Sequence, residues 1–101
     1  NPAHAQYHME DIQENSLGYT AWGSEVVIIK IRSQGALDGK VQTWVKYKDG
    51  ENTISTEVIC SYDGSDSTLS SMPANGSDPI YAALIKTACE HQAKLMRGMY
   101  N

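Results

Sequence analysis

Apolar residues recur every three or four positions near the C-terminal end of the chain. This spacing places them on one face of an α-helix. Asp78 and Pro79 precede the stripe as an N-cap acceptor and a proline at the first helical position, and Gly98 follows as a C-cap. We therefore predict a helix over Pro79–Arg97. The stripe consists of Tyr81, Leu84, Ile85, Ala88, Leu95, Met96 and Met99.

The middle of the chain has the pattern of a β-meander. Glu25–Arg32 contains an unbroken apolar run, which predicts a central strand covered on both faces over that stretch. Lys40–Lys48 and Asn52–Tyr62 alternate between apolar and polar residues, which predicts strands with one buried face. Asp38-Gly39 and Asp49-Gly50 are turn dipeptides at the two junctions.

The flanking segments have weaker patterns. Met9 and Ile12 stand among acidic residues and predict a short acidic helix. Gly18–Trp22 favours an extra strand or an extended arm. Asp63–Asp78 is a polar loop, long for a compact domain, and such loops are either functional or mobile.

The two cysteines, Cys60 and Cys89, are predicted to form a disulfide. Cys60 lies on the same strand face as Val58, and Cys89 borders the helix stripe four residues after Ile85. Both therefore face the interface between sheet and helix. The alternative is a pair of buried, reduced thiols in a cytosolic protein.

These elements predict an α+β fold, an antiparallel meander of three or four strands with one C-terminal helix packed on the sheet. The length of 101 residues fits one domain, which we place at 6–101. Residues 1–5 are expected to be a signal-peptide remnant or a disordered N-terminus, because Ala3-His4-Ala5 has the small-residue spacing of a cleavage site. With the disulfide, this predicts an exported protein, secreted or periplasmic. The sequence contains no apolar run long enough for a membrane span.

Charge is distributed unevenly along the chain. The net charge of −4 argues against a nucleic-acid partner. Cations are nevertheless concentrated on the two predicted central strands. Either they form a basic patch around Trp44, or they belong to an ordinary solvated sheet face. The cluster consists of Lys30, Arg32, Lys40, Lys46 and Lys48.

No motif for chemistry is found. The histidines and cysteines lack the spacing of a zinc site, and Asp63 and Asp66 lack the pattern of a calcium loop. No serine lies in a nucleophile elbow, and His91 is two residues from Cys89, so the two do not face each other on a helix. We therefore predict no catalytic residue, no metal and no cofactor.

By elimination, the sequence favours a small non-enzymatic protein that acts by protein–protein binding, such as an inhibitor, an immunity factor or a secreted effector. One alternative is a small hydrolase or carbohydrate-active enzyme with convergent carboxylates. Another is an assembly subunit that pairs through sheet edges, including a homodimer formed by strand exchange or edge pairing. Aromatic and cationic residues anchor interfaces, as does exposed methionine. The candidate contact residues are Tyr19, Trp22, Arg32, Trp44, Lys46, Lys48 and Met72.

Overall fold

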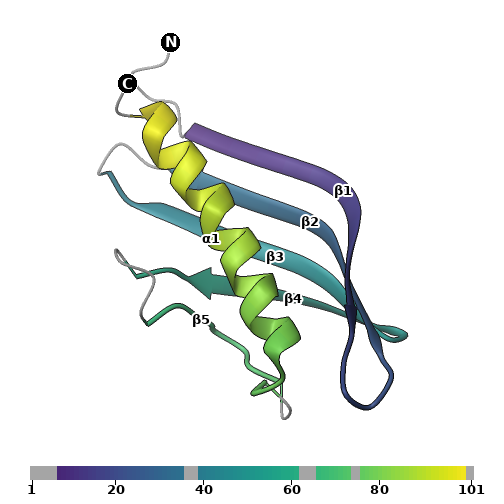
Figure 1. Cartoon of the computed structure of the whole chain (residues 1–101). Helices are drawn as coiled ribbons and strands as arrows, with labels where there is room; N and C mark the ends of the chain where they lie inside the picture. The colour runs from purple at the N-terminus through teal and green to yellow at the C-terminus, as the bar shows by residue number, and fades with distance from the viewer. Residues whose placement is uncertain (1–6, 36–38, 62–65, 74–75, 100–101) are drawn as a thin grey trace.

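The computed structural model describes residues 7–35, 39–61, 66–73 and 76–99, so the predicted signal remnant at 1–5 lies outside the described residues. Five antiparallel strands form one sheet in the order β1-β2-β3-β4-β5. A single helix, α1, follows them (Figure 1). The elements are β1 (Tyr7–Tyr19), β2 (Glu25–Gly35), β3 (Val41–Asp49), β4 (Asn52–Ile59), β5 (Thr68–Leu69) and α1 (Pro79–Met99).

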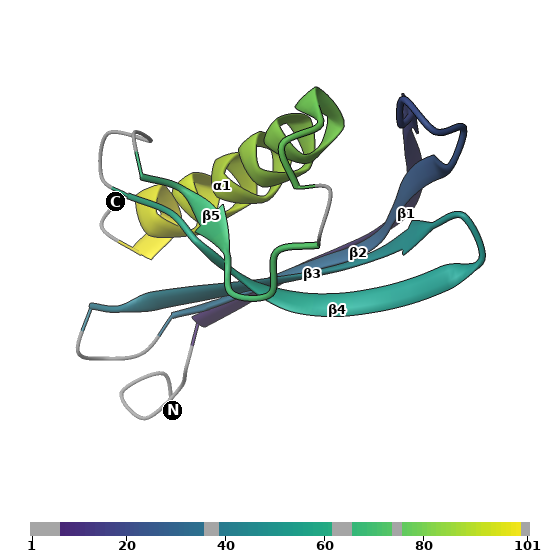
Figure 2. The ribbon, with the colours of Figure 1, turned by 90° about the horizontal axis from the view of Figure 1, so that it is seen from below.

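Helix α1 lies across one face of the sheet, and the sheet curves toward it (Figure 2). We call this the concave face and the opposite one the convex face. The predicted α+β meander with a C-terminal helix is therefore confirmed, and the alternation of β3 and β4 gives each strand one buried side. Between sheet and helix lies the core, which comprises Val26, Ile28, Ile31, Val45, Tyr47, Val58, Leu69, Ile80, Tyr81, Leu84 and Ala88.

A β-bulge in β2 determines which residues of this strand face the core. Ile28 pairs with Tyr47 and Lys30 pairs with Lys46, so two steps along β2 match one step along β3. The extra residue is Ile29, and it reverses the alternation of side chains beyond it. Because of this reversal the unbroken apolar run lies in an ordinary one-sided strand. The prediction that this stretch is covered on both faces is wrong, since α1 packs on the concave face only.

Residues 7–19 form a strand, so the predicted short acidic helix around Met9 and Ile12 is wrong. The strand β1 pairs with β2 along its length, with irregularities between Ile12 and Asn15 and between Ser16 and Gly18. The extra strand predicted over Gly18–Trp22 is present only at Gly18 and Tyr19, where β1 ends. Long-range pairing with β2 outweighs the weak local helical pattern here.

The start of α1 is fixed by Asp78, as the sequence predicted. One carboxylate oxygen accepts a hydrogen bond from the Ile80 amide at 3.0 Å, and the other accepts one from the Ala21 amide at 3.0 Å. The N-cap therefore also holds the turn between β1 and β2. One turn into the helix, the Tyr81 hydroxyl donates to Asp49 at 2.5 Å, and burial together with this bond raises the pKa of Tyr81.

The hairpin between β3 and β4 follows the predicted turn. Asp49 pairs with Asn52, which leaves Gly50 and Glu51 as a two-residue turn. Gly50 has a φ of 64°, and such a positive φ at the first turn position is a feature of type II′ hairpins. The tight turn fixes the register that brings Lys46 opposite Ser55.

Candidate functional site

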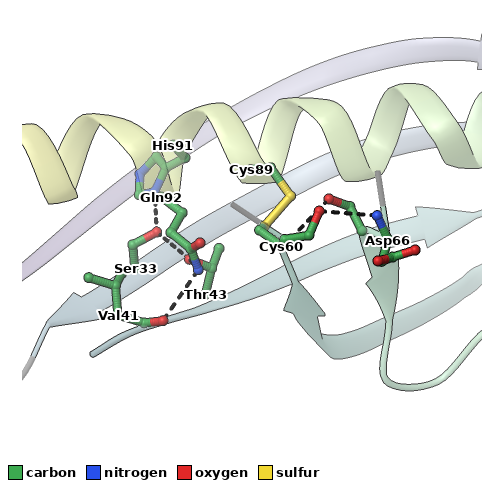
Figure 3. Close-up of a disulfide and its surroundings, with 10 residues drawn as sticks. Ser33, Val41, Thr43, Cys60, Asp66, Cys89, His91 and Gln92 are labelled. Carbon is green, nitrogen blue, oxygen red and sulfur yellow. Dashed lines mark hydrogen bonds between the residues drawn. A yellow bond between two sulfur atoms is a disulfide. The ribbon is translucent and has the colours of Figure 1, made fainter. Parts of the chain in front are cut away.

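The disulfide predicted between Cys60 and Cys89 is present, with a Cα–Cα distance of 5.7 Å. It joins the residue after β4 to the middle of α1 (Figure 3). Both cysteines pack against the core cluster, as their strand and helix faces indicated. The bond therefore holds the helix over the β4 side of the sheet.

A buried row of polar side chains lies between α1 and the sheet (Figure 3). The Ser33 hydroxyl is 2.7 Å from His91 Nδ1 and 2.8 Å from the Thr43 hydroxyl. The Gln92 amide donates to Thr43 at 3.1 Å and to the Val41 carbonyl at 3.3 Å. A serine beside a histidine is the geometry of a nucleophile and its base, but Ser33 has an exposed fraction of 0%. No substrate reaches such a hydroxyl, so the row positions the helix on the sheet.

A groove of ≈ 1020 Å³ follows the flank of α1 beside the disulfide. Val41, Ile85 and Met96 contribute apolar walls. The charged side chains at its edge alternate in sign along the helix, with Lys86 four residues before Glu90. Charges at this spacing offset one another, so the groove does not select an ionic ligand of one sign.

The convex face carries a second hollow, which Trp44 helps to line. It has a volume of ≈ 330 Å³ and spans the three central strands. Trp44 is half-buried, whereas Arg32 and Lys46 beside it are exposed. We call this feature the Trp44 hollow; its lining residues are Lys30, Arg32, Trp44, Val45, Lys46 and Ser55.

The bulge at Ile29 creates the cationic wall of the Trp44 hollow. Without it, Lys30 and Arg32 would share a face with the core residues Val26 and Ile28. With it, Ile31 enters the core and both cations lie on the convex side. The bulge at Ile29 therefore places the two cations of β2 beside Trp44 and keeps the concave face of β2 apolar.

Four cations lie on the convex side around Trp44, and Glu10 of β1 is opposite one of them, Arg32. Arg32 is directly opposite Trp44 on β2, and Lys30 is directly opposite Lys46. Lys48 lies two residues after Lys46, on the same side of β3 and exposed. The acidic residue Glu57 is opposite Trp44 on β4. Lys30 and Lys46 are like charges on facing positions, an arrangement that is destabilising unless a counter-charge lies near.

Four of the seven contact residues predicted from the sequence lie together in this region, namely Arg32, Trp44, Lys46 and Lys48. The other three do not line the Trp44 hollow. Tyr19 and Trp22, with exposed fractions of 68% and 47%, lie where β1 turns into β2. Arg32 is seven positions after Glu25, the partner of Tyr19, and this is about 23 Å along the strand. Met72, 45% exposed, lies in the segment before α1.

Two residues with a part in this arrangement were not foreseen. Ser55 lines the hollow from β4, but a serine in a strand gives no sequence signal for a contact. The sequence raises only catalysis and metal binding for His91, because its partner Ser33 is 58 positions away. Only the packing of helix on sheet brings such a pair together.

Other chemistry finds little support among the described residues. No three histidine, cysteine or acidic side chains of this part of the chain come together as a metal site. The carboxylates of Asp49 and Asp78 are held in hydrogen bonds that secure the helix. Within the described ranges, no helix has the length and hydropathy needed to span a membrane. Comparison of the chain with protein-family models, curated proteins and solved structures found no match.

Proposed function

We propose that this protein is an exported, non-enzymatic binding protein that recognises an acidic segment of another protein with the Trp44 hollow. The observation that carries the proposal is the position of Trp44, half-buried on the sheet face opposite α1 and flanked by cations from two strands. Charged residues alone are common on an open sheet face. A tryptophan that lines a hollow gives that face an apolar anchor as well.

The chemistry of the hollow fits an acidic peptide well. The guanidinium of Arg32 offers planar, paired donors for a carboxylate, and Lys46 offers a mobile ammonium group. One Arg32 nitrogen donates to the Gln34 side chain at 3.2 Å, which orients the guanidinium. The methylene groups of the segment's acidic side chains would contact the Trp44 ring.

The disulfide supports export. A Cys60–Cys89 bond persists in an oxidising compartment and is rare in the cytosol. Inhibitors, immunity factors and secreted effectors are protein classes that combine a small, disulfide-bonded domain with a binding face. The proposed partner is accordingly a protein of the extracellular space or the bacterial envelope.

The proposal is tested by calorimetric titration with two peptides. The first, Ac-Thr-Glu-Val-Glu-Val-Glu-Thr-NH2, is called the alternating peptide, and the second has lysine in place of glutamate. We expect the alternating peptide to bind in the micromolar range, more weakly as salt is raised, and the lysine peptide not to bind. Poly-L-glutamate serves as an acidic probe without apolar side chains.

Matched tryptophan variants locate the binding. Trp44→Ala should weaken binding of the alternating peptide about tenfold or more, because it removes the apolar anchor. Trp22→Ala, at the β1–β2 turn, should leave binding unchanged. Binding of neither acidic probe to the wild-type protein, or equal losses in the two variants, would refute the proposal.

A further inference from the structure

The edge of the sheet beside the Trp44 hollow is only half covered. Strand β5 pairs with β4 at two positions, Val58 and Ile59, and Ser70 continues the contact to Glu57. Among the described residues, no strand lies beside the remainder of β4 on this side. We propose, building on the proposed function, that the acidic partner segment binds as an added antiparallel strand along β4 at Thr53 and Ser55.

The direction of the backbone groups at this edge follows from the hydrogen bonds already present. The Ser70 amide donates to the Glu57 carbonyl at 2.8 Å, and the Glu57 amide donates to the Ser70 hydroxyl at 3.2 Å. Both backbone groups of Glu57 therefore point away from β3. In an antiparallel ladder this direction repeats at every second residue, so the amides and carbonyls of Ser55 and Thr53 also point outward.

Nothing in the described part of the chain blocks this stretch. After Ser70 the chain turns to the concave side of the sheet, where the Ser71 amide donates to the Thr56 hydroxyl at 3.0 Å. Thr56 is buried and faces the concave side. Thr53 and Ser55 are exposed. An added strand would thus continue the ladder that β5 begins and would form up to four backbone hydrogen bonds.

The side chains beside the edge define the segment that fits. Thr53 and Ser55 are small and lie directly opposite Lys48 and Lys46. An added strand lies about 9.5 Å from β3, two strand spacings away, and long lysine side chains reach across the short residues between. The two lysines are two residues apart, as are side chains on one face of the added strand.

The segment therefore carries acidic residues at alternate positions. Its acidic side chains lie on the convex side, opposite Thr53 and Ser55. The residue between them lies on the concave side next to Ile54, which is half-buried and packs on the core, so an apolar residue fits there. The expected motif is acidic–apolar–acidic in an extended conformation, which is one mode of peptide recognition by a sheet edge.

A second copy of the chain fits this edge less well. Its β4 would be the approaching strand, and Glu57 is the one charged residue that β4 contains. It would also bring the Lys46 and Lys48 of its own β3 toward those of the first copy. Charge complementarity therefore favours an acidic partner over self-association through β4.

The test uses the wild-type protein and two N-methylated forms of the alternating peptide. In an antiparallel pair, the peptide residues that exchange hydrogen bonds with Thr53 and Ser55 are the ones that share their face, which are the glutamates. N-methylation of the glutamates should weaken binding about tenfold or more, whereas N-methylation of the valines should change it less than twofold. Equal effects of the two modifications would overturn the added strand.

Protein variants provide an independent readout. Ser55→Pro removes the outward amide but no hydrogen bond of the β3–β4 ladder, so the strand tolerates it as an edge position. It should weaken binding about tenfold or more, while Ser55→Ala, which keeps the amide, should not. Amide hydrogen exchange of the wild-type protein should slow at Thr53 and Ser55 when the peptide is bound, and unchanged exchange there would contradict the proposal.

The outcomes separate the two proposals. Suppose that Trp44→Ala weakens binding of the alternating peptide, while Ser55→Pro and N-methylation of the glutamates do not. The proposal of an added strand is then wrong, and the proposal that the Trp44 hollow binds the acidic segment is retained. The same conclusion follows if poly-L-glutamate binds and the alternating peptide does not. Binding of neither probe refutes the proposed function itself. Light scattering of the unliganded protein that shows a dimer lost in Ser55→Pro would assign the edge to a second copy.

Discussion

Removal of the disulfide should lower the free energy of unfolding of the protein by a large fraction. The Cys60–Cys89 bond closes a loop with a sequence separation of 29 residues. In the chain-entropy model, closing such a loop stabilises the folded state by about 3.6 kcal/mol at room temperature. The free energy of unfolding of a domain of this size is about 5–15 kcal/mol. The double variant Cys60→Ala/Cys89→Ala should therefore lose between about a quarter and about seven tenths of it.

The assay is urea unfolding followed by tryptophan fluorescence under oxidising conditions. With a denaturant dependence of about 1.5 kcal/mol per molar urea, the midpoint of the double variant should fall by about 2 M. The wild-type protein after reduction and alkylation is the matched control and should fall by a similar amount. A midpoint lowered by less than about 0.5 M would refute the reasoning, because the bond would then contribute far less than loop closure requires.

Three further substitutions test the contacts that hold the helix. Folding raises the pKa of Tyr81 above its ordinary value of 10.0, mainly through burial and the bond to Asp49, so stability should be constant below that pH and fall above it. Tyr81→Phe should flatten this fall in urea unfolding at alkaline pH; an unchanged slope would contradict the assignment. Asp78→Ala should cost about 1–2 kcal/mol in the same assay, because it removes the N-cap, and a neutral result would show that the cap is dispensable. Ser33→Ala leaves the His91 ring nitrogen without its 2.7 Å partner and should cost about 1–3 kcal/mol; thermal unfolding unaltered by this change would exclude a stabilising polar row.

Much of the fold follows from local patterns in the sequence. The Asp78-Pro79 start and the apolar stripe predict α1, and Asp49-Gly50 predicts the β3–β4 turn, because caps and turns depend on neighbouring residues. The disulfide was predictable as well, since Cys60 and Cys89 each lie on the apolar face of their element. Each of these signals lies within one element or one turn.

The features that were missed depend on contacts between distant segments. Strand β1 pairs with β2 at positions such as Met9 and Ser33, and no local pattern records that pairing. The bulge at Ile29 moves Lys30 and Arg32 to the convex face, and it is defined only by the register with β3. The tryptophan and the cations of the Trp44 hollow could therefore be predicted, but Ser55 and the shape of the hollow could not.

The most direct test of the central claim is a fluorescence titration of Trp22→Phe with the alternating peptide. In this variant Trp44 is the only tryptophan of the chain. Our account predicts a saturable blue shift of its emission, because a bound segment removes the half-buried ring from water. The shift should weaken with added salt and be absent with the lysine peptide. Emission that stays unchanged while calorimetry shows binding would place the partner elsewhere on the protein and contradict the account.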